Sequence, residues 1–490
     1  MTPDTAELAI AEPTGESPAP LELMPGGRLA RLRGRAAERA RRVLAPVRED
    51  AARAVAIRDS WRALWSSRLL IWVAAALTVV TYGPGPMRHA FNPRGLTRGL
   101  GWLGNVLAAP AARWDAAWYL VIARYGYRPD LGAFTSSRAA FFPLYPLAVR
   151  ALGAIGLPLV LGGVLLSVGG LAVSLYGMHR LTSLELGACG GGAWPRLASR
   201  VGGSQPREVA RLAVLVTAFA PMALFLSAVY SESLYLALSI GLFYAARRGR
   251  FALVGLLAAL AGATRSAGIV LIVPALILYV YGPRSDRPPD FPRARGLAPR
   301  YRPRRDLLWL ALAPVGVGLF VVYMALAGGD ALAPFHAQDV WGRSFAGPYV
   351  GVWDGLRAAF EGVRQLISGQ QAHAYFPVGP KEGATIAAQH NIELAAFLIA
   401  GIVATVGVLR TLPFAYGAYV IAALALPLSY PVSTQPLMSL PRFLVVLFPL
   451  GIWFAAWLSA HPRARVPVLI CSVLLLAFFT AQFATWHWVA

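Results

Sequence analysis

The stretch LLWLALAPVGVGLFVVYMALA, residues 307–327, holds 21 residues and no charged side chain. A helix of that length crosses the ~30 Å hydrocarbon core of a bilayer at 1.5 Å per residue. It directly follows residues 283–306, which hold eight arginines and three aspartates. Cytoplasmic loops of membrane proteins carry an excess of arginine and lysine. The pair of segments therefore predicts a transmembrane helix that leaves the cytoplasm.

Similar apolar runs recur along the whole chain. The 490-residue sequence is 57% hydrophobic and only 14% charged, which favours a polytopic membrane protein over a soluble one. The ~10-residue alternating segments of a membrane β-barrel are not visible. We predict an all-α fold with eleven transmembrane helices. These lie at residues 62–82, 157–179, 209–228, 230–246, 251–264, 267–282, 307–327, 393–409, 412–430, 441–459 and 466–484.

The first 60 residues are predicted to form a separate basic segment on the cytoplasmic side. Residues 28–58 hold ten arginines among Ala, Leu and Val, which is typical of an amphipathic helix on the anionic inner leaflet. Residues 1–27 are rich in Pro, Glu and Ala and are predicted to be disordered. Residues 61–490 are predicted to form one membrane domain.

Two long loops, residues 83–156 and 328–392, are predicted on the outer face. If residues 139–156 were a transmembrane span, every later loop would lie on the opposite side of the membrane. We therefore interpret this segment as a juxtamembrane helix. The arginine-rich segment 283–306 then stays in the cytoplasm, as expected. One observation opposes this topology, because residues 83–138 hold seven arginines and two aspartates. Either the charge rule is loose for so long a loop, or these arginines bind an anionic ligand.

With this topology, ionisable residues from five separate segments collect near the outer face. Charges held close to the hydrocarbon are costly and usually face a cavity or a partner. Their convergence predicts an outward-facing site. The residues are Arg113, Asp115, Glu232, Arg265, His336, Asp339 and Arg442.

Each of these residues taken singly also has a purely structural explanation. A local salt bridge between Arg113 and Asp115 would pin an amphipathic helix. Glu232 would stabilise the N-terminus of its own helix, while Arg265 and Arg442 would extend to lipid head groups. For single residues the sequence leaves both explanations open.

The same holds for the aromatic residues and for the second outer loop. Trp114 and Tyr119 would fit an aromatic belt at the membrane interface, and His336 would fit an ordinary surface loop. Metal and nucleotide sites find no support, because the sequence lacks Asp-x-Asp, His-Glu-x-x-His and a phosphate-binding glycine loop. Two cysteines, Cys189 and Cys471, are too few for a metal site or disulfide framework.

The net charge of +22 does not indicate a nucleic-acid partner, because the arginines lie in gaps between hydrophobic runs. A carboxylate with several arginines and aromatic residues instead suits a lipid phosphate that carries a sugar. Arginine binds phosphate through a planar fork, and carboxylates suit sugar hydroxyl groups. We therefore expect membrane lipid and a lipid-linked sugar as partners, and no cofactor or metal.

Five motifs together resemble one enzyme family. In order they are RWDAAWYLVIARYGY (113–127), FFPLYPLAVR (141–150), YSESLYLALS (230–239), ATRSAG (263–268) and SLPRF (439–443). This order resembles that of PIG-V-type mannosyltransferases, the bacterial relatives of glycosylphosphatidylinositol mannosyltransferase II in the GT-C superfamily. The similarity covers roughly residues 60–460.

The resemblance implies a GT-C fold with juxtamembrane helices and catalytic residues in the first outer loop. Asp115 matches the position of the catalytic base, and Arg265, Arg442 and then Arg113 are candidates to hold the donor phosphate. The candidate substrate-binding residues are Trp114, Tyr119, Glu232, His336 and Gln338.

These expectations describe an inverting glycosyltransferase of the cell membrane. It would move mannose from a polyprenyl-phosphate donor to a glycolipid, glycan or protein, with mannose implied by the resemblance alone. Arginines would neutralise the phosphate leaving group, so that one carboxylate suffices as general base. The alternative is a transporter or flippase of lipid-linked sugars. Internal repeats and polar residues near mid-membrane would favour it, and the sequence shows no convincing repeat.

Overall fold

The structure is a computed structural model, and all regular elements of its described residues are helices. The chain divides into two units, residues 1–55 and 56–490. Of the first unit only the beginning of helix α1 (Gly26–Tyr82) is described, so residues 1–25 of the predicted disordered segment lie outside the description. The described residues are 26–85, 93, 95–127, 135–187, 206–291, 298–369 and 381–490.

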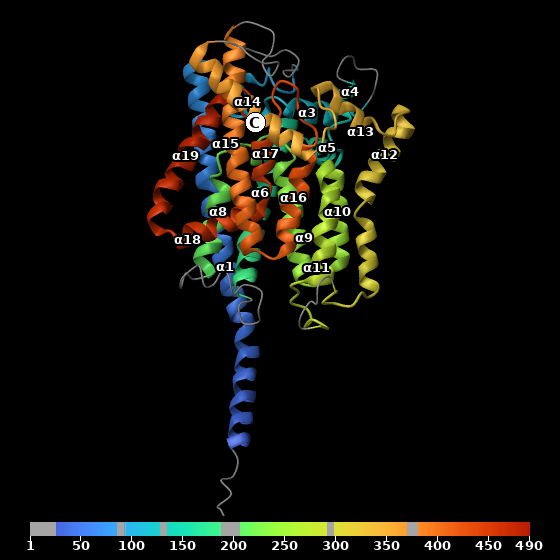
Figure 1. The fold of residues 1–490 in the computed structure, drawn as a ribbon, viewed down its shortest axis with the longest axis vertical. Coiled ribbons are helices and arrows are strands. Elements are labelled where there is room, and N and C mark those ends of the chain that lie inside the picture. The colour runs from blue at the N-terminus through green and yellow to red at the C-terminus, as the bar shows by residue number, and fades with distance from the viewer. Residues whose placement is uncertain are drawn as a thin grey trace, which may run out of the picture. The chain divides into compact units, whose positions relative to one another are not determined.

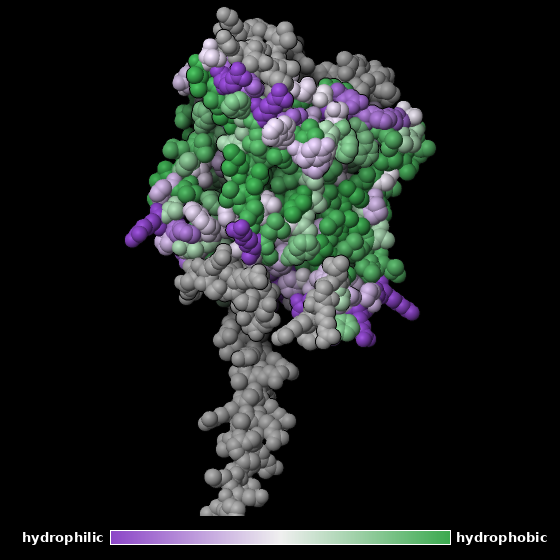
Figure 2. Space-filling view, in the orientation of Figure 1, coloured by the Kyte–Doolittle hydropathy of each residue, from purple (hydrophilic) through white to green (hydrophobic). Residues whose placement is uncertain are grey.

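Five of the described helical segments are long and apolar enough to cross a membrane. At most 39% of the most apolar window of each is buried inside the protein, as expected of helices that face lipid. Figure 2 shows the corresponding belt of hydrophobic residues across the middle of the 56–490 unit, between more hydrophilic ends. The segments are 49–82 of α1, 159–186 of α6 (Leu159–Gly187), 305–328 of η7 (Arg305–Leu312) and α12 (Val315–Gly328), 383–411 of α15 (Lys381–Thr411), and α19 (Pro462–Ala484).

The other predicted spans coincide with shorter helices. Their lengths of 4 to 16 residues fall below the ~20 residues of a full crossing. The described residues therefore fit an all-helical polytopic membrane protein, whereas the count of eleven spans is not confirmed. The shorter helices are α8 (Pro206–Ala218), α9 (Glu232–Arg247), α10 (Phe251–Thr264), η6 (Ser266–Leu271), α11 (Ile272–Tyr281), α16 (Phe414–Leu428), α17 (Leu440–Val445), α18 (Phe448–Ala460) and η5 (Ala223–Leu226).

The predicted span 209–228 is a helix only in its first half. Helix α8 ends at Ala218, shortly before Pro221, which disfavours helical geometry in the residue before it. The freed carbonyl groups need partners, because lipid offers none. The buried guanidinium group of Arg68 in α1 supplies them, donating to the carbonyl oxygens of Ala218 (2.9 Å) and Ala223 (3.0 Å).

The two long loops contain several short helices. Helix α5 (Leu144–Ala154) lies in the segment 139–156. Its 11 residues cover about 16 Å, roughly half of the hydrocarbon core, so α5 is too short to span a membrane. The remaining loop elements are α2 (Gly101–Leu107), η2 (Ala109–Ala112), α3 (Ala116–Tyr125), α4 (Thr135–Arg138), α13 (Ala333–His336), η8 (Ala337–Trp341) and α14 (Pro348–Ser368).

The loop helices gather at one end of the helix bundle. Figure 1 shows α3, α5, α13 and α14 at the upper end of the view, together with α17 and the C-terminus. The described parts of the arginine-rich segment between α11 and η7, residues 283–291 and 298–306, lie at the lower end. The bundle thus has two chemically different ends.

Candidate functional site

The turn Arg113–Trp114–Asp115 joins η2 to α3 and is fixed by a distant tyrosine. The hydroxyl of Tyr230 donates to the carbonyl oxygen of Arg113 (3.1 Å) and accepts from the backbone N–H of Asp115 (3.1 Å). Trp114 has φ +54°, a left-handed conformation that bulky residues rarely adopt. Its ring packs edge-to-face on Trp486 and Trp488. These contacts hold a strained turn with Asp115 directly before α3.

Asp115 begins a line of four charged side chains with alternating sign. Its Oδ2 lies 2.7 Å from Nη1 of Arg442, and Nε of Arg442 lies 3.2 Å from Oε1 of Glu232. The same Glu232 oxygen accepts a hydrogen bond from Nη1 of Arg265 (2.9 Å). We call Asp115, Arg442, Glu232 and Arg265 the charged line. Four segments far apart in sequence therefore meet here, as the sequence predicts.

The charged line is accessible at its aspartate and closed at its glutamate. The side chains of Asp115, Arg265 and Arg442 are 16%, 15% and 12% exposed, while Glu232 is 1% exposed. Within the described residues, Oε2 of Glu232 and Nε of Arg442 are buried without a hydrogen bond. A buried polar group left in this state is costly. The line therefore retains capacity for a polar ligand.

Aromatic rings surround both guanidinium groups. Arg442 lies 5.5–5.8 Å from the centres of four rings, and Arg265 lies 5.2 Å from Phe443 and 5.9 Å from Tyr235. Such contacts stabilise a cation away from water. Both arginines point toward carboxylates inside the protein. This favours the interpretation that they belong to a site over the interpretation that they extend to lipid head groups. The rings around Arg442 are Phe225, Tyr230, Phe443 and Trp488.

Glu232 is the first residue of α9, so its charge also favours the positive end of that helix. Its neighbour Ser231 shares a hydrogen bond of 2.9 Å with the hydroxyl of Tyr119. Burial is the largest cause that raises the pKa of Tyr119 to about 12, so this phenol is neutral at neutral pH. Tyr119 thus contributes an uncharged hydroxyl beside the charged line.

The interactions of three other sequence candidates lie outside the charged line. Arg113 donates to the carbonyl oxygen of Ala484 (3.3 Å) and stacks on Trp486. His336 is 62% exposed and pairs with Asp330 (2.9 Å). The backbone carbonyl of Gln338 accepts from Arg343. The sequence predicts that these three residues lie in loops, but it does not predict where those loops run in the folded protein.

Arg343 is a residue that the sequence analysis missed. It donates to the carbonyl oxygens of Tyr430 (3.3 Å) and Met438 (3.1 Å), on the segment that leads to Arg442. Burial, and then the charge of Arg442, lower the pKa of Arg343 to about 10, while the charge of Asp115 acts in the opposite direction. Arg343 is therefore a further cation beside the site. Its position in FHAQDVWGRS was the only available signal.

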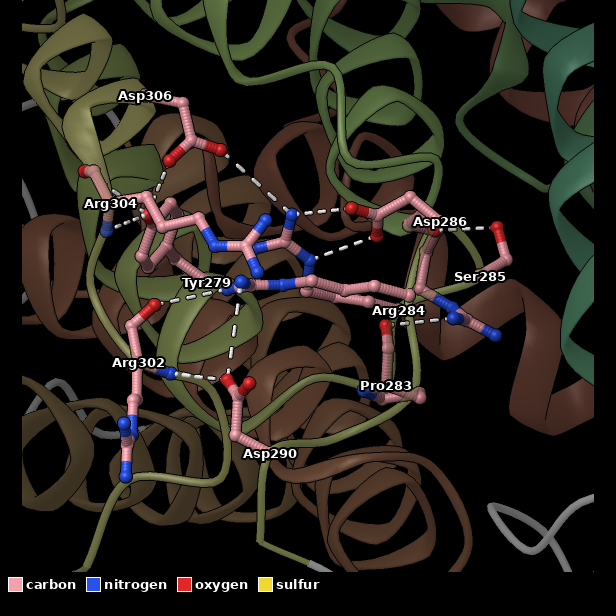
Figure 3. Close-up of polar contacts among 11 residues, drawn as sticks. Tyr279, Pro283, Arg284, Ser285, Asp286, Asp290, Arg302, Arg304 and Asp306 are labelled. Atoms are coloured by element: carbon pink, nitrogen blue, oxygen red, sulfur yellow. Dashed lines mark hydrogen bonds and ion pairs between the residues drawn. The ribbon is translucent and has the colours of Figure 1, made fainter.

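A second network of arginines and aspartates lies at the other end of the bundle. Figure 3 shows Arg284 bound to Asp286 (2.9 and 2.6 Å), with Tyr279, Arg304 and Asp306 beside them. The guanidinium group of Arg284 also lies 4.6–5.4 Å from three ring centres. These contacts hold together the loop that connects α11 to η7. We therefore interpret this network as structural.

The described residues contain no cluster of three His, Cys, Asp or Glu side chains placed to hold a metal ion. Cys471 is exposed, and Cys189 lies outside the described residues. The charged line offers guanidinium and carboxylate groups, which suit a ligand with phosphate and hydroxyl groups.

Comparison with known families identifies this part of the chain. No curated protein matches the sequence. The sequence profile of the family described as mannosyltransferase (PIG-V) matches residues 62–278, which include Asp115, Glu232 and Arg265 but end before Arg442. An all-helical membrane architecture is consistent with the GT-C superfamily. The resemblance to the PIG-V-type mannosyltransferases is therefore confirmed over residues 62–278.

Proposed function

We propose that this protein is an inverting glycosyltransferase that uses a polyprenyl-phosphate-linked mannose as donor. The family match over residues 62–278 supports mannosyl transfer. The charged line is the observation that carries the rest, because it places a partly exposed carboxylate, Asp115, at the end of a line that contains two arginines. Asp115 is the general base, and Arg265 and Arg442 hold the donor phosphate.

The proposed reaction needs one carboxylate that receives a proton. The ion pair with Arg442 engages Oδ2 of Asp115, so Oδ1 is the proposed acceptor of the proton from the acceptor hydroxyl. As this proton moves, the acceptor oxygen bonds to the anomeric carbon from the face opposite the phosphate. The bond from carbon to phosphate oxygen breaks, and the phosphate keeps the electron pair. Arginines stabilise that charge without transferring a proton.

Glu232 has a positioning role in this proposal. One of its oxygens contacts both arginines, which fixes the distance between the two guanidinium groups. Correct placement of reacting groups supplies a large share of catalysis, and errors of about 1 Å can cost a hundredfold in rate. Tyr119 and Trp114 are proposed to contact the sugar or the acceptor, and His336 and Gln338 remain candidates on sequence grounds alone.

The proposed location is the outer face of the cell membrane. The charged line lies where α3 and α17 meet, at the opposite end of the bundle from the arginine-rich segment 283–306. Arginine-rich loops favour the cytoplasm, so the opposite end is assigned to the outside. Placement at one end also supports an enzyme over a flippase, which would be expected to bind its substrate near mid-membrane.

The test is glycosyl transfer in proteoliposomes. Wild type, Asp115→Asn and Asp286→Asn receive radiolabelled polyprenyl-phosphate mannose and a lipid and envelope extract from the host. Asp286→Asn removes the same charge from the structural network and is the matched control. We expect a new labelled product with wild type and the control but not with Asp115→Asn.

The other results of that test are also informative. Label that stays on the carrier but changes sides of the bilayer in all three proteins would establish the flippase instead. Equal product from wild type and Asp115→Asn would remove Asp115 from its assigned role. The chemical nature of a new product would identify the acceptor.

A further inference from the structure

A pocket of about 380 Å³ lies behind the turn that carries Asp115. Its walls come from the end of α1, from α2 and η2, and from the C-terminal segment at Trp486. The volume falls in the range of ~300–1,000 Å³ that is common for small-molecule sites. The C-terminal wall is tightly packed, because a Cβ atom on Gly85 would come within 2.3 Å of the carbonyl oxygen of Thr485. The pocket is therefore part of the fold.

Hydrogen-bond donors line this pocket, and its lining includes no carboxylate. Nε of Arg98 and Nε1 of Trp486 are buried, and neither has a hydrogen-bond partner among the described residues. The guanidinium group of Arg113 lies 4.7 Å from the centre of the Trp486 ring, and that residue is 3% exposed. Two cations, an unused donor on Arg98 and another on Trp486, and no opposing charge in the lining favour an anion. A phosphoryl group offers the best match to arginine.

The rim of the same pocket is apolar and exposed. Val80 and Trp102, which line the pocket, are 63% and 73% exposed, and Leu77, Leu103 and Leu107 beside them are 57–62% exposed. Residues 49–82 of α1 are a candidate membrane span, so this rim continues a surface that faces lipid. A free anion would leave the apolar rim unused. A ligand with both an anionic group and a hydrocarbon chain fits both parts.

We propose that this pocket binds the phosphoryl group of a membrane lipid, whose hydrocarbon chain lies along the end of α1. The lipid is either the polyprenyl phosphate or an ordinary anionic phospholipid, which share this chemistry. The site is separate from the charged line, since Arg113 and Asp115 reach different partners from one turn. Trp114 lies between them and packs on both Trp486 and Trp488.

The test measures lipid binding to the full-length protein in uncharged detergent by native mass spectrometry. The probes are polyprenyl phosphate, phosphatidylglycerol and the uncharged polyprenol. Arg98→Gln is the test variant, because within the described part of the chain Arg98 makes no hydrogen bond or ion pair with the charged line or its turn. Arg124→Gln is the matched control, since Arg124 is an exposed arginine on α3 of the same loop. Thermal unfolding confirms that each variant is folded.

We expect Arg98→Gln to weaken binding of at least one phosphorylated lipid about tenfold, because one charged hydrogen bond is lost. Arg124→Gln should bind as wild type does, and polyprenol should bind weakly to all three proteins. Loss confined to polyprenyl phosphate assigns the pocket to the donor or its product, and loss confined to phosphatidylglycerol assigns it to bulk lipid. Equal binding to wild type and Arg98→Gln for both lipids, or binding of polyprenol as tight as its phosphate, would overturn the proposal. Failure of glycosyl transfer would leave this binding result intact.

Discussion

Helix α9 carries a buried ion pair at each end, and the two pairs differ in access. At its last residue, Arg247 binds Glu185, and these side chains are 2% and 0% exposed. At its first residue, Glu232 binds Arg265 and Arg442, which are 15% and 12% exposed. The two ends are about 22 Å apart at 1.5 Å per residue. The same residue types therefore occur in a sealed setting and in an open one.

The sealed pair is also the better satisfied one. Oε1 of Glu185 accepts from Tyr416 (2.7 Å) as well as from Arg247, and Arg247 donates to the carbonyl oxygen of Pro283 (2.7 Å). At the open end, Oε2 of Glu232 has no hydrogen bond within the described residues. Burial of charge alone thus does not indicate a functional site. Access and unused hydrogen-bonding capacity distinguish the charged line.

Glu185→Gln should give the largest change in stability. It leaves Arg247 buried without its counter-charge, and breaking a buried pair in this way typically costs roughly 3–5 kcal/mol. We expect a clearly lower thermal unfolding midpoint in detergent, with unchanged glycosyl transfer per folded molecule. A stable Glu185→Gln protein that has lost transfer would reverse the roles of the two ends.

The same substitution at the other end, Glu232→Gln, should mainly affect the reaction. Arg442 keeps Asp115 as a partner, so the loss of stability should be smaller than for Glu185→Gln. We expect transfer to fall about a hundredfold, because the two arginines lose their common anchor. Initial rates and unfolding midpoints of both glutamate variants, measured together, check this contrast. Identical behaviour of the two variants would remove the distinction between the ends.

Arg265→Gln should produce a smaller effect, confined to donor binding. One charge-assisted hydrogen bond contributes about 1.5–3 kcal/mol, and we expect the lower end of that range for the partly exposed Arg265. The value of kcat/KM for the donor should therefore fall about tenfold. A higher donor concentration should restore the rate of the variant, whereas a higher acceptor concentration should not. An unchanged donor dependence would mean that Arg265 only supports Glu232.

Asp286→Asn should produce the smallest effect. Burial acts to raise the pKa of Asp286, but the hydrogen bonds and charge of Arg284 outweigh it and hold that pKa below its ordinary value. The stabilisation is therefore present at neutral pH and is lost as pH falls below the ordinary aspartate range. For a partly exposed pair we expect about 0–1 kcal/mol. Unfolding midpoints between pH 7 and pH 3 should converge for wild type and variant at the acid end.

The sequence predicts the helical membrane architecture because apolar runs and arginine-rich gaps are local features. It does not predict where helices break within those runs. The end of α8 at Ala218 depends on Arg68, which is about 150 residues away and supplies the missing hydrogen bonds. Such a contact is a property of the folded chain, so span lengths could not be obtained from composition.

The candidate site also has features that the sequence predicts and features that depend on the folded chain. Asp115, Glu232, Arg265 and Arg442 could be grouped because each lies near a predicted helix end on one side. The separation of Arg113 from them depends on a turn with a left-handed tryptophan, and no local pattern reveals that conformation. Arg343 was missed because its backbone contacts come from a segment about 90 residues later.

The most direct test of the central claim compares Asp115→Asn with Glu185→Gln in one transfer assay, normalised to folded protein. The account predicts that Asp115→Asn folds normally but transfers about 10²–10⁴-fold more slowly, the usual contribution of a general base. Glu185→Gln should unfold more readily and transfer at the wild-type rate per folded molecule. Transfer by folded Asp115→Asn at the wild-type rate would contradict the assignment of the charged line as the catalytic site.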